Sequence, residues 1–232
     1  MEKEQVLALY LDAPLQSWGY HSRFDRRTTF SCPTRSGIIG MIAAAMGIER
    51  DDTNALARFN TMEMKILILV PTKGNIFPGT GLTDFHTVGG GFDPKTQRRH
   101  LPRKASGHMP ATVVSRREYL QDAKFGVLLA DIPEFLAKID FALKDPVWGL
   151  FLGRKSCIPA VPICQGLFSD AAAATEYIEN LSGWTVQGKF MTAETYEAGE
   201  NTIMDIPENF QKRCYASRHV RTACITTEAV SQ

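Results

Sequence analysis

The sequence lacks any long hydrophobic run. Its longest apolar stretch, residues 38–46, has nine residues and contains Gly40, whereas a membrane-spanning helix needs about 20 apolar residues. The acidic segment at residues 1–4 is not typical of a secretory signal. We therefore expect a cytoplasmic protein without a membrane partner.

The sequence also lacks the patterns of common metal and nucleotide enzymes. Its five cysteines include no CxxC pair, so the thiols suit a reducing compartment better than disulfides or a zinc site. There is no P-loop, GxGxxG or HExxH motif. From these absences we predict that the protein binds no metal and no cofactor. The sequence also has no repeat of fixed period that would indicate a solenoid.

The charge is unevenly distributed in a chain of ordinary globular composition. The 232 residues are 44% hydrophobic and 22% charged, with a net charge of +1, and they suffice for one large or two small domains. From Lys95 to Arg117 there are seven basic residues, two histidines and no acid, which leaves 19 basic and 25 acidic residues elsewhere. Such a cationic arm favours a polyanionic partner. The alternative is a solvated, partly disordered loop.

Residues 33–47 have the pattern of a helix with a polar amino end. Thr34 or Ser36 suits the N-cap, and Gly47 suits the position after the last turn. Two interpretations of the helix start stay open. The free backbone N–H groups, the two hydroxyls and Arg35 would together suit a phosphate. Alternatively, the hydroxyls only cap the helix and its glycines allow close packing.

The order of apolar runs predicts an α+β fold of the ferredoxin-like or RRM-like type. We expect core strands at residues 6–11, 62–70, 124–130 and 150–153, and helices at 34–47, 51–59 and 134–143. A polar loop at 16–32 joins the first strand to the first helix.

A long β-hairpin, the thumb, is expected as an insertion in this domain. Its legs are residues 79–88 and 112–120, and its glycine-rich, basic tip is 89–110. A helix at 171–181 and short strands between 184 and 225 follow. We divide the chain into an RRM-like domain at 1–160, with the thumb at about 79–120, and a small β-rich C-terminal region at 161–232. Acids dominate from 170 to 208, a surface that suits protein partners.

Side chains able to stack on unpaired bases flank the arm. They are Phe85, His86, His100, His108 and Tyr119. His86, His108, Tyr119 and Lys104 are also residue types that a metal-independent ribonuclease uses as acid and base, but their spacing fixes no mutual geometry.

Five ordered segments carry a family pattern: APLQSWG at 13–19, PTRSGIIGMIAAAMGI at 33–48, GLTDFHTV at 81–88, RREYLQDA at 116–123 and LGRKSC at 152–157. Together they resemble the CasD group of the Cas5 family, in the RAMP superfamily, from type I-E CRISPR Cascade complexes. The resemblance implies a subunit that caps the Cascade backbone and holds the 5′ handle of the CRISPR RNA without catalysis, while base pairing recognises the target. Its implied partners are the backbone subunit CasC, the large subunit CasA and, indirectly, target DNA.

Other functions stay open. Related subunits of type I-C systems cleave precursor CRISPR RNA, so a metal-independent endoribonuclease is one alternative, and a protein scaffold with an incidental basic loop is another. The tip at 89–110 departs from the family pattern, so Arg98, Arg99, Arg103 and Lys104 contact RNA, target DNA or a neighbouring subunit.

The resemblance places RNA contacts at positions inside the matching segments, and charge or stacking adds others. The first group is Trp18, Thr34, Arg35, Ser36, His86, Thr87, Arg116, Arg117, Arg154 and Lys155; the second is Arg26, Arg27, Arg98, Arg99, Lys104 and Tyr119.

Overall fold

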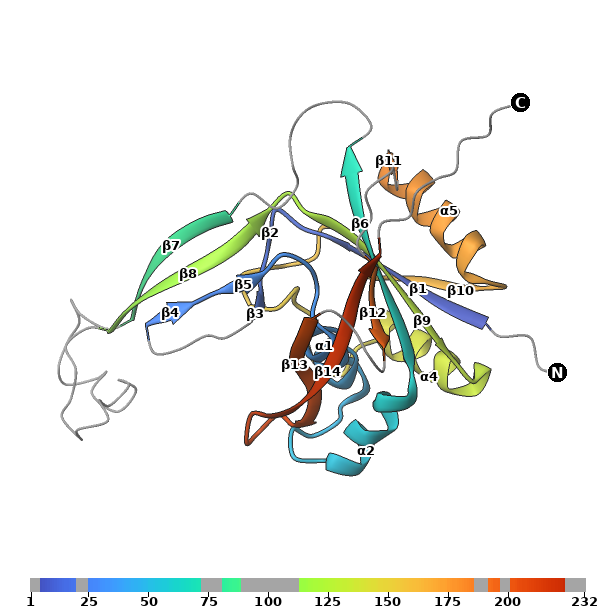
Figure 1. Cartoon of the computed structure of the whole chain (residues 1–232), viewed down its shortest axis with the longest axis horizontal. Helices are drawn as coiled ribbons and strands as arrows, with labels where there is room; N and C mark the ends of the chain where they lie inside the picture. Colours follow the sequence, from blue (N-terminus) through green and yellow to red (C-terminus); the bar gives the residue numbers. More distant parts are fainter. Residues whose placement is uncertain are drawn as a thin grey trace.

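A central antiparallel sheet organises the computed structural model, which describes residues 5–19, 25–71, 81–88, 113–185, 192–196 and 201–223. The strand order is β10-β1-β9-β6-β11 (Figure 1). The strands are β1 (Gln5–Asp12), β6 (Glu63–Pro71), β9 (Lys124–Asp131), β10 (Cys164–Phe168) and β11 (Trp184–Thr185). With α1 (Arg35–Met46) after β1 and α4 (Pro133–Lys144) after β9, the chain runs β-α-β-β-α-β through the sheet. The α+β class is therefore confirmed.

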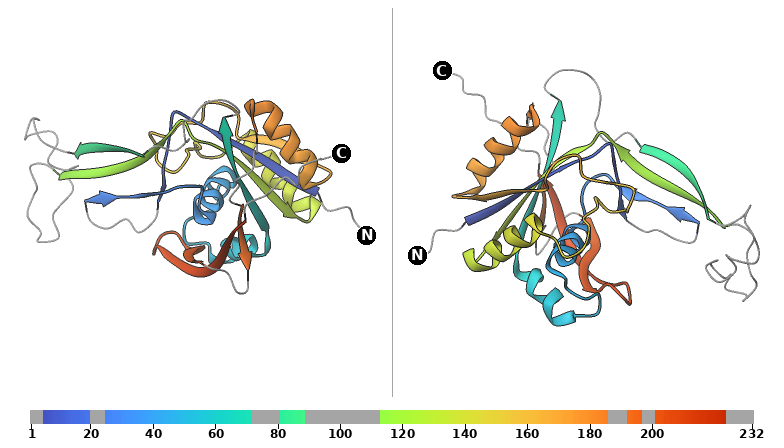
Figure 2. Two further views of the ribbon diagram at one scale, coloured as in Figure 1. Left: turned by 45° about the horizontal axis from the view of Figure 1, so that its top comes forward. Right: turned by 180° about the vertical axis from the view of Figure 1, so that it is seen from behind.

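Both faces of this sheet are covered by helices. Successive side chains of a strand point to opposite faces, so Leu7 and Leu9 of β1 pack with α1 and α4, while Val6 and Ala8 pack with α5 (Ala171–Ser182). Figure 2 shows the strands between these layers. No helix in the described ranges is long and apolar enough to cross a membrane.

The helix boundaries follow the predicted local signals. The side chain of Thr34 accepts a hydrogen bond from the Gly37 N–H, and Gly47 ends α1 with φ of 70°. Asp52 caps α2 (Thr53–Arg58), which continues into the short helix η1 (Phe59–Thr61). The predicted helices at 34–47, 51–59, 134–143 and 171–181 are thus confirmed within a few residues.

The predicted hairpin legs are also confirmed. Strands β7 (Gly81–Val88) and β8 (Val113–Gln121) pair antiparallel in unbroken register, from Gly81 opposite Leu120 to Val88 opposite Val113. The hairpin extends away from the central sheet (Figure 1). Its predicted tip lies outside the described residues.

Two predictions about local structure are wrong. The loop at 16–32 contains short strands, β2 (Leu15–Gln16), β3 (Trp18–Gly19), β4 (Arg26–Arg27) and β5 (Thr29–Phe30), of which β2 and β4 pair with β8. Residues 150–153 form no strand, because the Leu152 N–H donates to the Cys157 carbonyl and its carbonyl accepts from the Ser17 N–H. The fourth strand of the β-α-β-β-α-β order is instead β10, paired with β1.

The C-terminal residues form a second sheet. Strands β12 (Thr192–Tyr196), β13 (Asn201–Asn209) and β14 (Cys214–Ala223) pair antiparallel in the order β12-β14-β13. This matches the expected strand-rich region, and β13 packs beside α1 and α2. The position of that sheet brings C-terminal residues to the start of α1.

Candidate nucleic-acid interface

Strand β8 lies at the centre of a small basic sheet. Strand β4 pairs parallel with it, which places Arg26 beside Arg116 and Arg27 beside Arg117. The Arg116 N–H also donates to the carbonyl of Asp25 at 2.8 Å. Because consecutive residues alternate between faces, each face of this sheet carries two neighbouring arginines.

A groove of about 460 Å³ runs along one face of the sheet. Five of the predicted RNA contacts line it: His86, Arg117, Tyr119, Arg154 and Lys155. They come from β7, β8 and the turn at 152–157, which are far apart in the sequence. The fold thus brings together basic and aromatic side chains that are far apart in the sequence.

The turn at 152–157 is fixed by its glycine and its hydrogen bonds. Gly153 has φ of 96°, and a Cβ atom there would overlap the carbonyl oxygen of Ser17. The next residue, Arg154, donates to the carbonyls of Glu118 at 2.9 Å and Arg27 at 2.8 Å. Its guanidinium carbon lies 4.6 Å from the centroid of the Tyr119 ring. Arg154 therefore links β4 to β8 through its hydrogen bonds at the edge of the groove.

A second pocket, of about 270 Å³, opens at the start of α1. Its lining includes Thr34, Ser36 and Gly37 of the helix start, Arg27 and Arg154 from the basic sheet and turn, and Phe210 and Tyr215 from the C-terminal hairpin. Arg154 borders both cavities, so the groove and the pocket adjoin at this side chain. The two aromatic residues could not be predicted as part of this site, because nothing in their spacing links them to a helix so far upstream.

Comparison with known proteins places the chain in a family. Residues 6–221 match the family model described as CRISPR-associated protein (Cas_Cas5). The chain belongs to the Cas5 family. It is 32% identical over 223 residues to the CRISPR system Cascade subunit CasD of Escherichia coli (strain K12), covering 91% of this chain and 92% of that protein.

Solved structures agree with this assignment. A chain of a CRISPR RNA-guided surveillance complex is similar with a TM-score of 0.71 and 29% identity, over 94% of this chain and 89% of that one. A crystal structure of a Cas protein is similar with a TM-score of 0.65 and 29% identity, over 96% of both chains. The resemblance carried by the five sequence segments is therefore confirmed.

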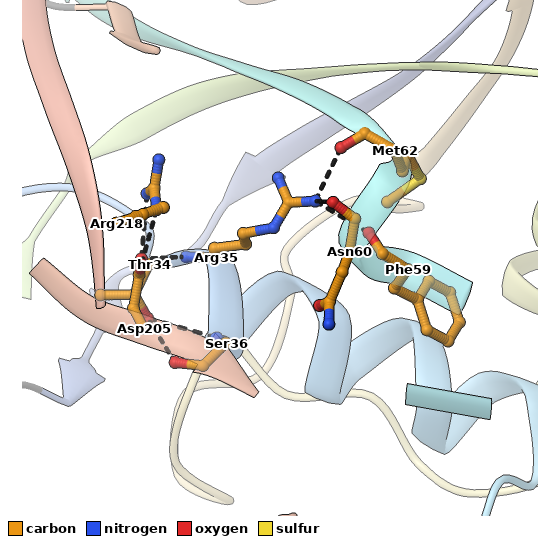
Figure 3. Close-up of polar contacts among 9 residues, drawn as sticks. Thr34, Arg35, Ser36, Phe59, Asn60, Met62, Asp205 and Arg218 are labelled. Carbon is orange, nitrogen blue, oxygen red and sulfur yellow. Dashed lines mark hydrogen bonds and ion pairs between the residues drawn. The ribbon is translucent and has the colours of Figure 1, made fainter. Parts of the chain in front are cut away.

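The structure gives Arg35 of this Cas5 protein a structural role in place of the predicted RNA contact (Figure 3). Its side chain is 5% exposed and donates to the carbonyls of Phe59 at 2.8 Å, Asn60 at 3.3 Å and Met62 at 2.7 Å. Burial lowers the pKa of Arg35 to about 10. The guanidinium thus ties α1 to the residues of η1 and to Met62, and Arg35 lines neither the groove nor the pocket.

A protein carboxylate occupies part of the predicted phosphate site at the start of α1. The Arg35 N–H donates to Asp205 of β13 at 2.7 Å, and Arg218 of β14 binds that carboxylate at 2.6 Å. Both acid and base are buried. The capping interpretation therefore holds for the backbone, and Thr34, Ser36 and Gly37 are the residues of the helix start that line the pocket.

Trp18 of this Cas5 chain is a core residue. Its side chain is 1% exposed, and its indole N–H donates to the side-chain oxygen of Gln16 at 3.2 Å. The ring lies so close to Gly37 that an added Cβ would be 2.8 Å from a ring carbon. Trp18 borders the pocket at the start of α1, but it exposes too little surface for a base to stack on and packs in the core.

The other predicted contacts lie at several places. Arg26, Thr87 and Arg116 are exposed on the basic sheet, and by alternation they lie on the face away from the groove. Arg98, Arg99 and Lys104, together with Arg103, His100 and His108, fall outside the described residues. Among the described residues, no group of three or more His, Cys, Asp or Glu side chains could hold a metal ion.

Proposed function

We propose that this Cas5 protein is a non-catalytic RNA-binding subunit of a Cascade-type CRISPR RNA-guided surveillance complex, and that it holds the 5′ handle of the CRISPR RNA. The family membership and the similarity to a Cascade subunit support this role. The observation that carries it is the gathering of Arg27, Arg117, Arg154 and Lys155 around the groove and the adjoining pocket. Clustered cations beside ring systems are the recurring means of holding a single strand.

The groove offers phosphate contacts more than open stacking platforms. Arg117 and Lys155 present charged groups along its wall. A guanidinium has five N–H donors, so Arg154 keeps donors for a phosphate after bonding two backbone carbonyls. Tyr119 lies buried beneath Arg154 and holds that cation in position.

The pocket at the start of α1 continues the path of the strand. The Thr34 hydroxyl oxygen accepts the Gly37 N–H at 3.2 Å and lies 3.4 Å from the Ser36 hydroxyl oxygen. One of these two hydroxyls donates to the other, which leaves one hydroxyl hydrogen to donate to a phosphate oxygen. Ser36 and Arg27 line the same pocket. We assign the surrounding β-α-β-β-α-β domain to the ferredoxin-like, RRM-like class with the β7–β8 hairpin as its thumb.

The partners that we propose are the backbone subunit CasC and the large subunit CasA, with target DNA involved indirectly. Exposed apolar side chains at the far end of α1 and on α4 suit a protein contact. They include Phe141, Val147 and Trp148.

Charge reversal in the groove tests the RNA-binding proposal. Arg117→Glu and Lys155→Glu should each weaken binding of labelled repeat RNA to the full chain, and should lower the slope of log affinity against log salt by about 0.7 for each lost phosphate contact. Lys138→Glu, on the exposed face of α4, makes the same charge change away from the groove and serves as the control. Equal losses in all three variants, measured by fluorescence anisotropy, would contradict the proposal and favour a protein scaffold.

One observation keeps the endoribonuclease as a second candidate. His86, Tyr119 and Lys155 line one groove, and these residue types can act as acid and base. Repeat RNA incubated with the purified chain in EDTA should remain intact. Specific cleavage that His86→Ala abolishes would establish the nuclease and refute the non-catalytic role.

A further inference from the structure

The thumb hairpin has a second face that the groove does not use. Asp84, His86 and Arg117 line the groove, whereas their neighbours Phe85 and Arg116 do not. Since side chains alternate along a strand, Phe85 and Arg116 point to the opposite side of the hairpin. This opposite face has no role in the function proposed above.

A row of three side chains crosses the opposite face. Arg26 of β4 is beside Arg116 of β8, and Arg116 is opposite Phe85 of β7. The corresponding row on the groove face, Arg27, Arg117 and Asp84, includes an acid, whereas this row has none. On the same face of β8, Glu118 lies further toward the core and is half-buried.

Phe85 is held as an exposed ring beside a cation. Its side chain is 64% exposed, and the guanidinium carbon of Arg116 lies 5.3 Å from the ring centroid. Such a contact orients the ring and is worth only about 0.5–1 kcal/mol at an exposed site. The remaining ring surface faces solvent, which costs hydrophobic free energy unless a ligand covers it.

We propose that Phe85, Arg116 and Arg26 form a second nucleic-acid site, in which an unpaired base stacks on Phe85 and its flanking phosphates bind the two arginines. Stacking of a base on an aromatic side chain requires an unpaired or splayed base, so the ligand is a single strand. The absence of an acid from the row makes its charge complementary to a phosphate chain. This inference extends the proposed RNA function to the other side of the thumb.

Two labelled strands of equal length and charge separate stacking from charge. One is a short oligouridylate, and the other is the same ribose-phosphate chain without bases. Phe85→Ala should weaken binding of the full chain to oligouridylate about 5- to 150-fold, and should change binding of the abasic strand by less than about twofold. Phe85→Tyr should bind oligouridylate like the unchanged chain.

Phe141→Ala is the matched control, because Phe141 is 73% exposed on α4, and it should leave both affinities unchanged. Equal weakening of both strands by Phe85→Ala would mean that Phe85 only positions Arg116, and would overturn the inference. If Phe85→Ala has no effect while Lys155→Glu weakens both strands, this face binds no nucleic acid and is left for a protein partner, but the proposed function stands. If neither variant has an effect, both proposals fail.

Discussion

Replacing Gly153 by alanine adds one methyl group and should displace the turn that borders the groove. An added Cβ would overlap the carbonyl oxygen of Ser17 and lie 2.7 Å from its carbonyl carbon, inside the 3.0 Å that real Cβ contacts essentially always keep. Both groups are backbone, so no side-chain rotation relieves the overlap. In Gly153→Ala the turn at 152–157 must therefore move away from Ser17, which lies between β2 and β3.

The structure sets the size of this effect. A positive φ costs an L-residue roughly 1–2 kcal/mol, and Gly153 has φ of 96°. Moving the turn also breaks the 3.1 Å hydrogen bond from the Ser17 N–H to the Leu152 carbonyl, which is worth about 1 kcal/mol. With the strain that remains, we expect the free energy of unfolding to fall by about 3 kcal/mol or more.

Gly166 supplies the control. It has φ of 102°, but an added Cβ would meet no atom within 4 Å, so Gly166→Ala should cost only the backbone term of about 1–2 kcal/mol. Urea unfolding followed by circular dichroism measures both variants. Because Arg154 follows Gly153 directly, Gly153→Ala should also weaken RNA binding under native conditions, and Gly166→Ala should not. Equal stability of the two variants would refute the close-approach argument.

Two further predictions concern ion pairs. Asp205→Asn should lower the free energy of unfolding by about 3–5 kcal/mol, because the buried Arg218 loses a carboxylate 2.6 Å away; a loss under about 1 kcal/mol in urea titrations would contradict this. Hydrogen bonding to Arg58 lowers the pKa of Asp131. This pair therefore stabilises the fold at pH values above the unfolded carboxyl pKa of about 4. Its contribution is lost as the pH falls through the lower pKa of the folded state. Asp131→Asn should remove that part of the acid dependence, at a cost below about 1 kcal/mol at neutral pH since Arg58 is partly exposed.

Features set by neighbouring residues could be predicted from the sequence. The N-cap at Thr34 and the left-handed Gly47 depend on hydroxyl chemistry and glycine conformation within a few residues. The fourth strand of the sheet could not be predicted in this way. Residues 150–153 are apolar and resemble a strand, whereas β10 contains Gly166 and lies at the edge of the sheet with no fully buried position.

The charged residues of the candidate site could be predicted from the sequence, but their arrangement in space could not. Arg117 and Arg154 stand out in the sequence, yet their common groove depends on pairing between distant strands. Arg35 carries the same charge, and only the fold reveals that its guanidinium is buried against three backbone carbonyls. A sequence shows that a cation is present without showing which groups it contacts.

The start of α1 depends on the hairpin of β13 and β14 on both its inner and its outer side. On the inner side, Asp205 of β13 accepts the first helical N–H. On the outer side, Phe210 and Tyr215 close the pocket into which Thr34 projects. The C-terminal sheet therefore supplies both the carboxylate that fixes the helix start and one wall of the proposed RNA pocket. Removing it should consequently impair RNA binding through this pocket even if the central sheet remains folded.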